Sequence, residues 1–269
     1  MNLPDAADER HAIFSLHPRL PDLNRPSHLY VGLHVVSPDP AATNNVPPAN
    51  VRRLLADAHE HGWSVNLIDD NPRKLILTFD DGRPLGDELI GLMDEFGATG
   101  VFFVSTYRYL PGYDPARPYA HEMSEADRRY LLSRHVIGSH TQAHAPLPAM
   151  TAAEQRRRLE QDFSEFEQAF GFRPWCFSYP WGLYNAATLR AIKSLGVRSA
   201  FLAAPGGGAK SPSHPYTIPR VFPEAFRLPP ERFTLNALLE ADARRKYRLK
   251  SLIRRAHALA AVGQVHRRA

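Results

Sequence analysis

The fold of this chain is decided by the stretch Leu75-Ile76-Leu77-Thr78-Phe79-Asp80-Asp81-Gly82, in which an apolar run ends abruptly at two carboxylates and a glycine. A short apolar run of this kind is typical of a strand buried on both faces. We therefore predict a buried strand that presents Asp80 and Asp81 at its C-terminal end. Because neighbouring carboxylates repel each other, a fold that keeps both there usually neutralises one with a cation or separates their protonation states.

A second motif, Gly138-Ser139-His140-Thr141-Gln142-Ala143-His144, offers a site for such a cation. Its two imidazoles stand at a spacing that lets both reach one metal ion, as in zinc-binding His-x3-His pairs. One carboxylate and two histidines leave coordination positions open for water and substrate. That is the catalytic form of a metal site and not the structural form.

The rest of the chain alternates apolar strands with amphipathic helices. Strands are predicted near residues 29–36, 63–67, 74–79, 99–104, 136–137, 175–178, 198–202 and 216–222. Helices are predicted near residues 48–58, 85–96, 152–170 and 186–195, and a further short helix is predicted to begin after Ser124. Repeated βα units predict an α/β barrel whose active site lies at the C-terminal ends of the strands. Both motifs fall at or just past such ends.

Length and composition predict one catalytic domain. A chain of 269 residues with 43% hydrophobic content can bury one large core. We divide it into an N-terminal arm (1–27), a barrel (28–230) and a basic helical tail (231–269). The single cysteine permits no intramolecular disulfide, and the N-terminus has neither a basic nor an apolar leader region. These features predict a cytoplasmic protein.

The basic charge is concentrated in the tail. Residues 241–269 carry a net +8, so the preceding 240 residues are mildly acidic at −3. The tail sets apolar residues at helical spacing between arginines, which predicts an amphipathic helix with a basic face. Three readings remain open: docking on the barrel, peripheral contact with anionic lipid or a glycolipid phosphate at the inner membrane face, and nucleic-acid binding. The last is disfavoured because only one aromatic residue, Tyr247, stands among the basic ones.

Three motifs in order resemble those of the polysaccharide deacetylase family, also called the NodB-homology or carbohydrate esterase family 4 group. They are Thr78-Phe79-Asp80-Asp81-Gly82, then His140-Thr141-x-x-His144, then Phe177-Ser178-Tyr179-Pro180-Trp181-Gly182, and the resemblance covers roughly residues 28 to 223. It implies a distorted (β/α)7 barrel. It also implies a metal-dependent hydrolase that removes an N-acetyl group from an amino sugar.

The resemblance assigns roles to the first two motifs. It implies that Asp80 is the general base and that Asp81, His140 and His144 hold one divalent metal ion. An aspartate and two histidines suit Zn2+, although Co2+, Ni2+ or Fe2+ fit the same ligands. Thr141 either orients a ligand or caps the turn that follows.

The third motif departs from the family pattern. Ser178 stands where most members have an arginine that pairs with the catalytic aspartate, and we expect Arg220 to replace that arginine. The resemblance places Tyr179, Pro180 and Trp181 on the substrate side. It implies that the backbone N–H of Trp181 helps to hold the oxyanion and that its indole forms a wall for a sugar ring.

A leaving amine also needs a general acid. The late Leu-x-His motif that supplies it in ordinary members is missing. Leu33-His34-Val35-Val36 instead resembles the early strand-end histidine of a circularly permuted subgroup typified by the poly-N-acetylglucosamine deacetylases. His34 is therefore the expected acid, and His214 in the late loop is the alternative.

The expected function is deacetylation of an N-acetylated saccharide or glycolipid precursor. O-deacetylation and N-deformylation are alternatives within the same chemistry. A non-catalytic carbohydrate-binding barrel is an alternative of another class, supported only by the missing arginine at Ser178.

Overall fold

The computed structural model describes residues 27–42, 44–106, 123–204, 214–226 and 229–243. Nearly all of the predicted arm and most of the predicted basic tail lie outside these ranges. The two boundaries between the arm, the barrel and the tail therefore remain predictions.

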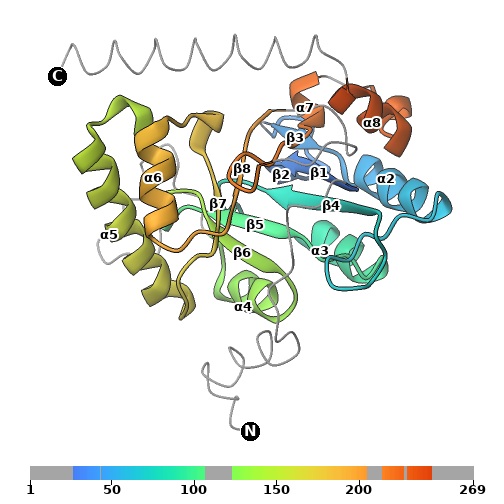
Figure 1. Cartoon of the computed structure of the whole chain (residues 1–269). Coiled ribbons are helices and arrows are strands. Elements are labelled where there is room, and N and C mark those ends of the chain that lie inside the picture. Colours follow the sequence, from blue (N-terminus) through green and yellow to red (C-terminus); the bar gives the residue numbers. More distant parts are fainter. Residues whose placement is uncertain (1–26, 43, 107–122, 205–213, 227–228, 244–269) are drawn as a thin grey trace, which may run out of the picture.

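A curled parallel sheet forms the centre of the molecule (Figure 1). Within the described residues it has six strands in the order β1-β4-β5-β6-β7-β8. Their bounds are β1 His28–Leu33, β4 Lys74–Phe79, β5 Val101–Val104, β6 Val136–Ser139, β7 Cys176–Ser178 and β8 Ser199–Phe201. Because every pairing is parallel, the C-terminal ends of all these strands lie at the same edge.

The segment that follows β8 completes the distorted (β/α) barrel expected from the sequence. Ile218 forms a single parallel bridge to Phe201 of β8, and Val221 forms one to Val31 of β1. The N–H of Ile218 donates to Ala200 O and that of Val221 donates to Tyr30 O, both at 2.9 Å. The predicted strand 216–222 thus lies between the last strand and the first one.

Helices connect the strands and cover the sheet. The main ones are α2 Pro48–Glu60, α3 Asp87–Glu95, α4 Glu125–Arg134, α5 Ala152–Phe170 and α6 Ala186–Ser194. In Figure 1, α5 and α6 lie side by side at one end of the sheet and α2 and α3 at the other. The side chains of Ser124, Thr151 and Asn185 cap the first turns of α4, α5 and α6.

Two predicted strands differ from the structure. The region 63–67 forms only one bridge, between Ser64 and Lys74, because the Ser64 hydroxyl accepts from the N–H of Asn66 and makes a local turn. The predicted strand 29–36 breaks at His34. Its last part, β2 Val35–Val36, pairs with the short β3 Asn45–Val46 and not with the main sheet.

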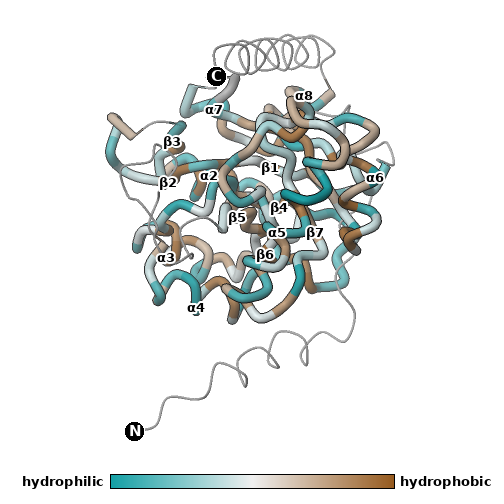
Figure 2. Tube along the Cα trace, turned by 90° about the vertical axis from the view of Figure 1, so that its left-hand side faces the viewer, coloured by the Kyte–Doolittle hydropathy of each residue, from teal (hydrophilic) through white to brown (hydrophobic). Residues whose placement is uncertain are grey.

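The core lies on both faces of the strands. All residues of β1 and β4 are buried, as the apolar run of β4 predicted. Hydrophobic and hydrophilic residues interleave along the outer helices in Figure 2, as expected of helices with one face on a core. No helix in the described ranges is long and apolar enough to cross a membrane.

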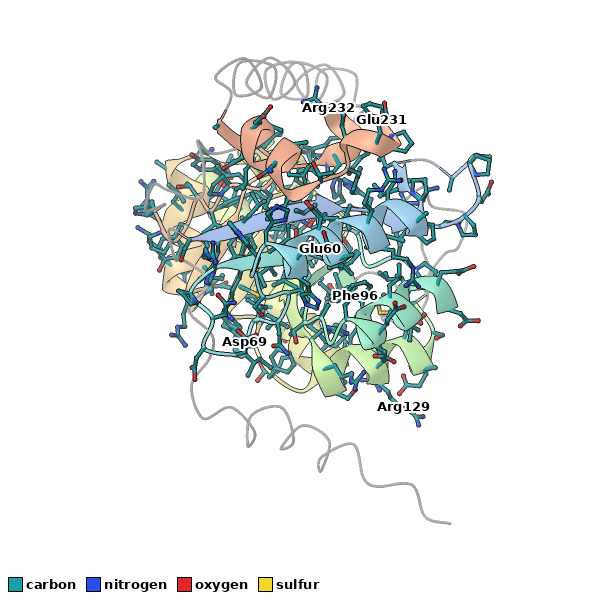
Figure 3. The ribbon with its side chains drawn as sticks, turned by 90° about the vertical axis from the view of Figure 1, so that its right-hand side faces the viewer. Glu60, Asp69, Phe96, Arg129, Glu231 and Arg232 are labelled. Carbon is teal, nitrogen blue, oxygen red and sulfur yellow. The ribbon has the colours of Figure 1, made fainter. Side chains whose placement is uncertain are left out.

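The chain after the barrel returns to α2. The short elements η4 Pro230–Arg232 and α8 Leu235–Ala243 lie beside this helix, as Figure 3 shows for Glu231 and Arg232 above Glu60. The N–H of Leu235 donates to Asp57 Oδ2 at 2.6 Å. The first part of the predicted tail is therefore anchored to the barrel.

Candidate active site

The site lies at the C-terminal edge of the sheet. Asp80 and Asp81 follow β4, His140 follows β6 and Ser178 ends β7. Strand order alone brings these residues together, because β4, β5, β6 and β7 are consecutive neighbours. The prediction that both motifs share one edge of a parallel sheet is confirmed.

Asp81, His140 and His144 form a group that can hold a metal ion. Asp81 Oδ1 lies 3.6 Å from His140 Nε2 and 3.7 Å from His144 Nε2, and the three ligand atoms all lie within 4.8 Å of one another. His140 Nδ1 lies 2.8 Å from the carbonyl oxygen of Ser178. Since a carbonyl only accepts, Nδ1 carries the proton and Nε2 keeps its lone pair toward Asp81. One carboxylate oxygen and two imidazole nitrogens fit a divalent ion.

Strained backbone is concentrated at this site. Five residues other than glycine have a positive φ in the described part of the chain. Four of them belong to the motifs: Asp81 at 71°, Thr141 at 63°, His144 at 54° and Trp181 at 60°. Such conformations cost free energy and persist where the surroundings hold them. Their clustering indicates that the side-chain directions here are imposed by the fold.

Asp80 forms a buried ion pair with Arg220. Nη1 of Arg220 lies 2.7 Å from Asp80 Oδ1, and Nη2 lies 2.8 Å from Oδ2. Burial by itself raises the pKa of Asp80. The positive charge of Arg220, joined by His140 and by the hydrogen bonds from the guanidinium, outweighs burial and holds that pKa well below its usual range. Asp80 is therefore a carboxylate at any pH near neutrality.

The guanidinium of Arg220 is 0% exposed and lies over the ring of Phe222, 4.8 Å from its centroid. Its Nη2 also donates to Ser178 Oγ at 2.7 Å, while that hydroxyl lies 3.4 Å from Asp80 Oδ2. The serine at the family's arginine position thus supports an arginine that arrives from another segment.

His34 pairs with a carboxylate that sequence reasoning missed. Its Nδ1 lies 2.8 Å from Oε1 of Glu224 in the short helix α7 Pro223–Phe226. Burial lowers the pKa of His34, but the hydrogen bond and charge of Glu224 and the charges of Asp80 and Asp81 raise it above its usual value. No local pattern marks Glu224. It reaches His34 because Val221 pairs beside β1, which only the fold reveals.

The other predicted residues divide between the site and its support. Trp181 is 47% exposed, and its ring meets that of His144 edge-on at 4.8 Å. Pro180 is buried in the short helix η3 Pro180–Gly182. Thr141 Oγ1 accepts from the N–H of Ala145 at 2.8 Å, which is the turn-capping alternative.

Tyr179 was expected on the substrate side and His214 was the alternative general acid. Neither side chain lies in a position that favours its expected role. Tyr179 is fully buried and its hydroxyl donates to Tyr216 O at 2.9 Å, so its side chain packs behind the site and does not face a substrate. His214 is exposed, and its Nδ1 accepts from the N–H of Tyr216 in its own loop.

Comparison with known proteins shows that the chain is similar to members of one family. The family model described as polysaccharide deacetylase matches residues 68–200. The curated protein YxkH of Bacillus subtilis (strain 168), named for the same family, is 23% identical over 178 residues, which is 61% of this chain and 61% of YxkH. The match therefore spans less than two thirds of that relative.

Two solved structures share the fold. The Streptococcus pyogenes deacetylase PplD, solved in complex with acetate, has a TM-score of 0.62 at 16% identity, covering 82% of this chain and 98% of PplD. IcaB from Ammonifex degensii has a TM-score of 0.63 at 14% identity, covering 81% of this chain and 97% of IcaB. At these identities the likeness concerns the fold.

Proposed function

This chain belongs to the polysaccharide deacetylase family, and on that premise we propose that it is a metal-dependent hydrolase that removes an N-acetyl group from an amino sugar in a saccharide or glycolipid precursor. The observation that carries the proposal is the placement of the Asp81, His140 and His144 group beside an Asp80 that Arg220 keeps ionised. O-deacetylation and N-deformylation need the same groups and remain alternatives.

The metal ion that we propose is Zn2+, held by Asp81 Oδ1, His140 Nε2 and His144 Nε2. When bound, such an ion supplies Lewis acidity that polarises a carbonyl oxygen and lowers the pKa of water. The hydrogen bond from His140 Nδ1 to Ser178 O supports this role, because it fixes the tautomer of the ligand. Co2+, Ni2+ or Fe2+ would suit the same donors.

Asp80 is the proposed general base. It accepts the proton of the attacking water on a carboxylate oxygen. The bidentate pair with Arg220 fixes the plane of the carboxylate and keeps it deprotonated. A carboxylate with so low a pKa is a weaker base. The pKa of the attacking water would therefore have to be lowered by the ion that Asp81, His140 and His144 would hold.

His34 is the proposed general acid. Because Glu224 engages Nδ1, the proton that reaches the leaving amine comes from Nε2. Glu224 also keeps the imidazole protonated to higher pH, as the raised pKa of His34 indicates. The raised pKa of His34 and the lowered pKa of Asp80 widen the pH range in which the acid is protonated while the base is ionised.

Trp181 is the proposed wall of the sugar site. Its exposed indole beside His144 offers an apolar face for a pyranose ring, and its backbone N–H is the proposed donor to the oxyanion. The partner is an N-acetylated saccharide or glycolipid. Peripheral contact of the basic tail with an inner membrane face is part of the same proposal.

Acetate release from N-acetylglucosamine oligosaccharides and lipid-linked N-acetyl sugars tests the function. The full chain should release acetate, lose this activity with a chelator and regain it with Zn2+. Asp80→Asn should keep the metal and lose turnover, whereas His214→Ala should stay active. Stoichiometric metal binding without release from any of these substrates would contradict the N-deacetylase and point to another acyl group or to a barrel that has lost its activity.

A further inference from the structure

A buried carboxylate lies behind the histidine turn, on helix α5. Asp162 is 1% exposed and accepts two hydroxyl hydrogen bonds: Oδ2 from Ser139 Oγ at 2.5 Å and Oδ1 from Thr106 Oγ1 at 2.9 Å. Burial raises the pKa of Asp162 to about 7. Burying a carboxyl group is costly, so its presence points to a task that an apolar side chain cannot perform.

The Ser139 hydroxyl connects this carboxylate to the histidine turn. Ser139 ends β6, immediately before His140, and its Oγ accepts from the N–H of Thr141 at 3.1 Å. A serine hydroxyl has one proton and two lone pairs. Because the proton is committed to Asp162, the lone pairs are directed toward the Thr141 N–H.

The turn needs such an anchor because its backbone is strained. Thr141 and His144 both have left-handed φ values, 63° and 54°, although neither is glycine. Each such residue costs roughly 1–3 kcal/mol and persists only where neighbours determine its conformation. The side-chain hydroxyl of Thr141 accepts from Ala145 N within the turn, whereas the Ser139 contact holds the turn from outside it.

We propose that Asp162 is a positioning residue for the metal site, which acts through the Ser139 hydroxyl to hold Thr141 in its left-handed conformation and so directs His140 and His144 toward Asp81. This inference rests on the metal-dependent function proposed above. The chain of contacts runs from a helix through a strand end into the turn, and every side chain in it is buried or nearly so.

Zn2+ affinity of the chelator-treated full chain, measured by calorimetry, tests the inference together with the visible spectrum of the Co2+-loaded protein. Ser139→Ala removes the link and leaves the packing of α5 intact. It should weaken Zn2+ binding by about 10- to 100-fold, the usual effect of losing an outer partner of a ligand, and shift the Co2+ bands. Asp162→Ala should do the same. Asp162→Asn keeps a carbonyl oxygen for Ser139 and should restore most of the affinity.

Two matched controls separate positioning from general loss of stability. Thr106→Val removes the other hydrogen bond of Asp162 but leaves its link to Ser139. Gln155→Ala removes a buried polar side chain from the same helix, one that accepts from Thr188 Oγ1 on α6 at 2.7 Å and has no part in the turn. Both controls should bind Zn2+ like the wild type and give its Co2+ spectrum.

The outcomes distinguish the two proposals. Wild-type Zn2+ affinity and an unchanged Co2+ spectrum in both Ser139→Ala and Asp162→Ala would overturn the positioning role and leave the metal site standing. An equal loss in Gln155→Ala would also overturn it, since the effect would then be general. A wild-type chain that binds neither Zn2+ nor Co2+ would overturn the metal-dependent function itself.

Discussion

Arg220 holds both carboxylate oxygens of Asp80 across 140 residues of sequence, with Nη1 2.7 Å from Oδ1 and Nη2 2.8 Å from Oδ2. The arginine comes from the segment that closes the sheet between β8 and β1, while the aspartate directly follows β4. Ser178, at the position where the family pattern has an arginine, accepts a hydrogen bond from the same guanidinium. The charge that the third motif lacks is thus supplied through the closure of the barrel.

Arg220→Lys should therefore impair turnover and change its pH dependence. A lysine keeps the charge but not the bidentate geometry, so the pKa of Asp80 should rise toward its usual value. A base has to be deprotonated, so the acid limb of the kcat/KM profile should move to higher pH. We expect kcat to fall by about 10²- to 10⁴-fold. An unchanged acid limb would contradict this tuning.

Arg220→Met gives the matching stability measurement. Removing the cation leaves an unpaired carboxylate in a buried site, and the free energy of unfolding should fall by about 3–5 kcal/mol in urea titrations near neutral pH. Ser178→Ala loses only a hydroxyl at the edge of the pair and should cost less. If the two variants lose equal stability, the ion pair is not the main stabilising contact here.

Glu224→Gln should shift the opposite limb of the activity profile. The carboxylate raises the pKa of His34, so its loss should lower that pKa. A general acid has to be protonated, so activity should start to fall at lower pH than in the wild type. Glu231→Gln, at an exposed position in η4, is the control and should keep the wild-type alkaline limb. The same shift in both variants would exclude a specific role for Glu224.

His135 should make the fold sensitive to acid. Burial lowers the pKa of His135 to about 3, whereas an unfolded histidine titrates near 6.5. Between these two pH values, His135 binds a proton in the unfolded chain but not in the folded chain. The free energy of unfolding should therefore fall as pH decreases from about 6.5 to about 3, by up to about 1.4 kcal/mol per pH unit.

Urea titrations of His135→Gln between pH 7 and 4 check this prediction. Glutamine keeps an acceptor for the N–H of Gly100, which His135 Nδ1 now receives at 3.1 Å, but it does not titrate. The stability of the variant should depend less on pH than that of the wild type. His214→Gln, which changes an exposed histidine, should keep the wild-type slope.

Gly138 and Gly91 should respond to alanine in opposite directions. A Cβ on Gly138, within β6, would lie 2.6 Å from Cys176 Sγ and 2.7 Å from Cys176 O, so the sheet has to shift. Gly138→Ala should cost about 1–3 kcal/mol or more of unfolding free energy. Gly91→Ala, on an exposed turn of α3 with no atom within 4 Å, should stabilise the chain by about 0.5–1 kcal/mol. Thermal or urea unfolding of both variants measures these two changes in the free energy of unfolding.

Sequence by itself determined the features that depend only on residues close to one another along the chain. The buried strand before Asp80, the capping side chains at Ser124 and Thr151, and the joining of the two motifs at one sheet edge all follow from local periodicity and from the rule that parallel strands end together. These features can be predicted because the backbone geometry of a helix or strand fixes which residues, a few positions apart, lie on the same face.

Tertiary structure alone revealed two of the partners. Glu224 meets His34 across 190 residues, and Asp162 meets Ser139 from a helix whose exposed face is strongly polar. The pairing of Arg220 with Asp80 was expected from the sequence, but its bidentate geometry is set by the fold. Each contact requires the closing segment or α5 to pack in one particular place against the sheet. That placement is set by the burial of side chains from the whole barrel, so it cannot be predicted from any short stretch of the sequence.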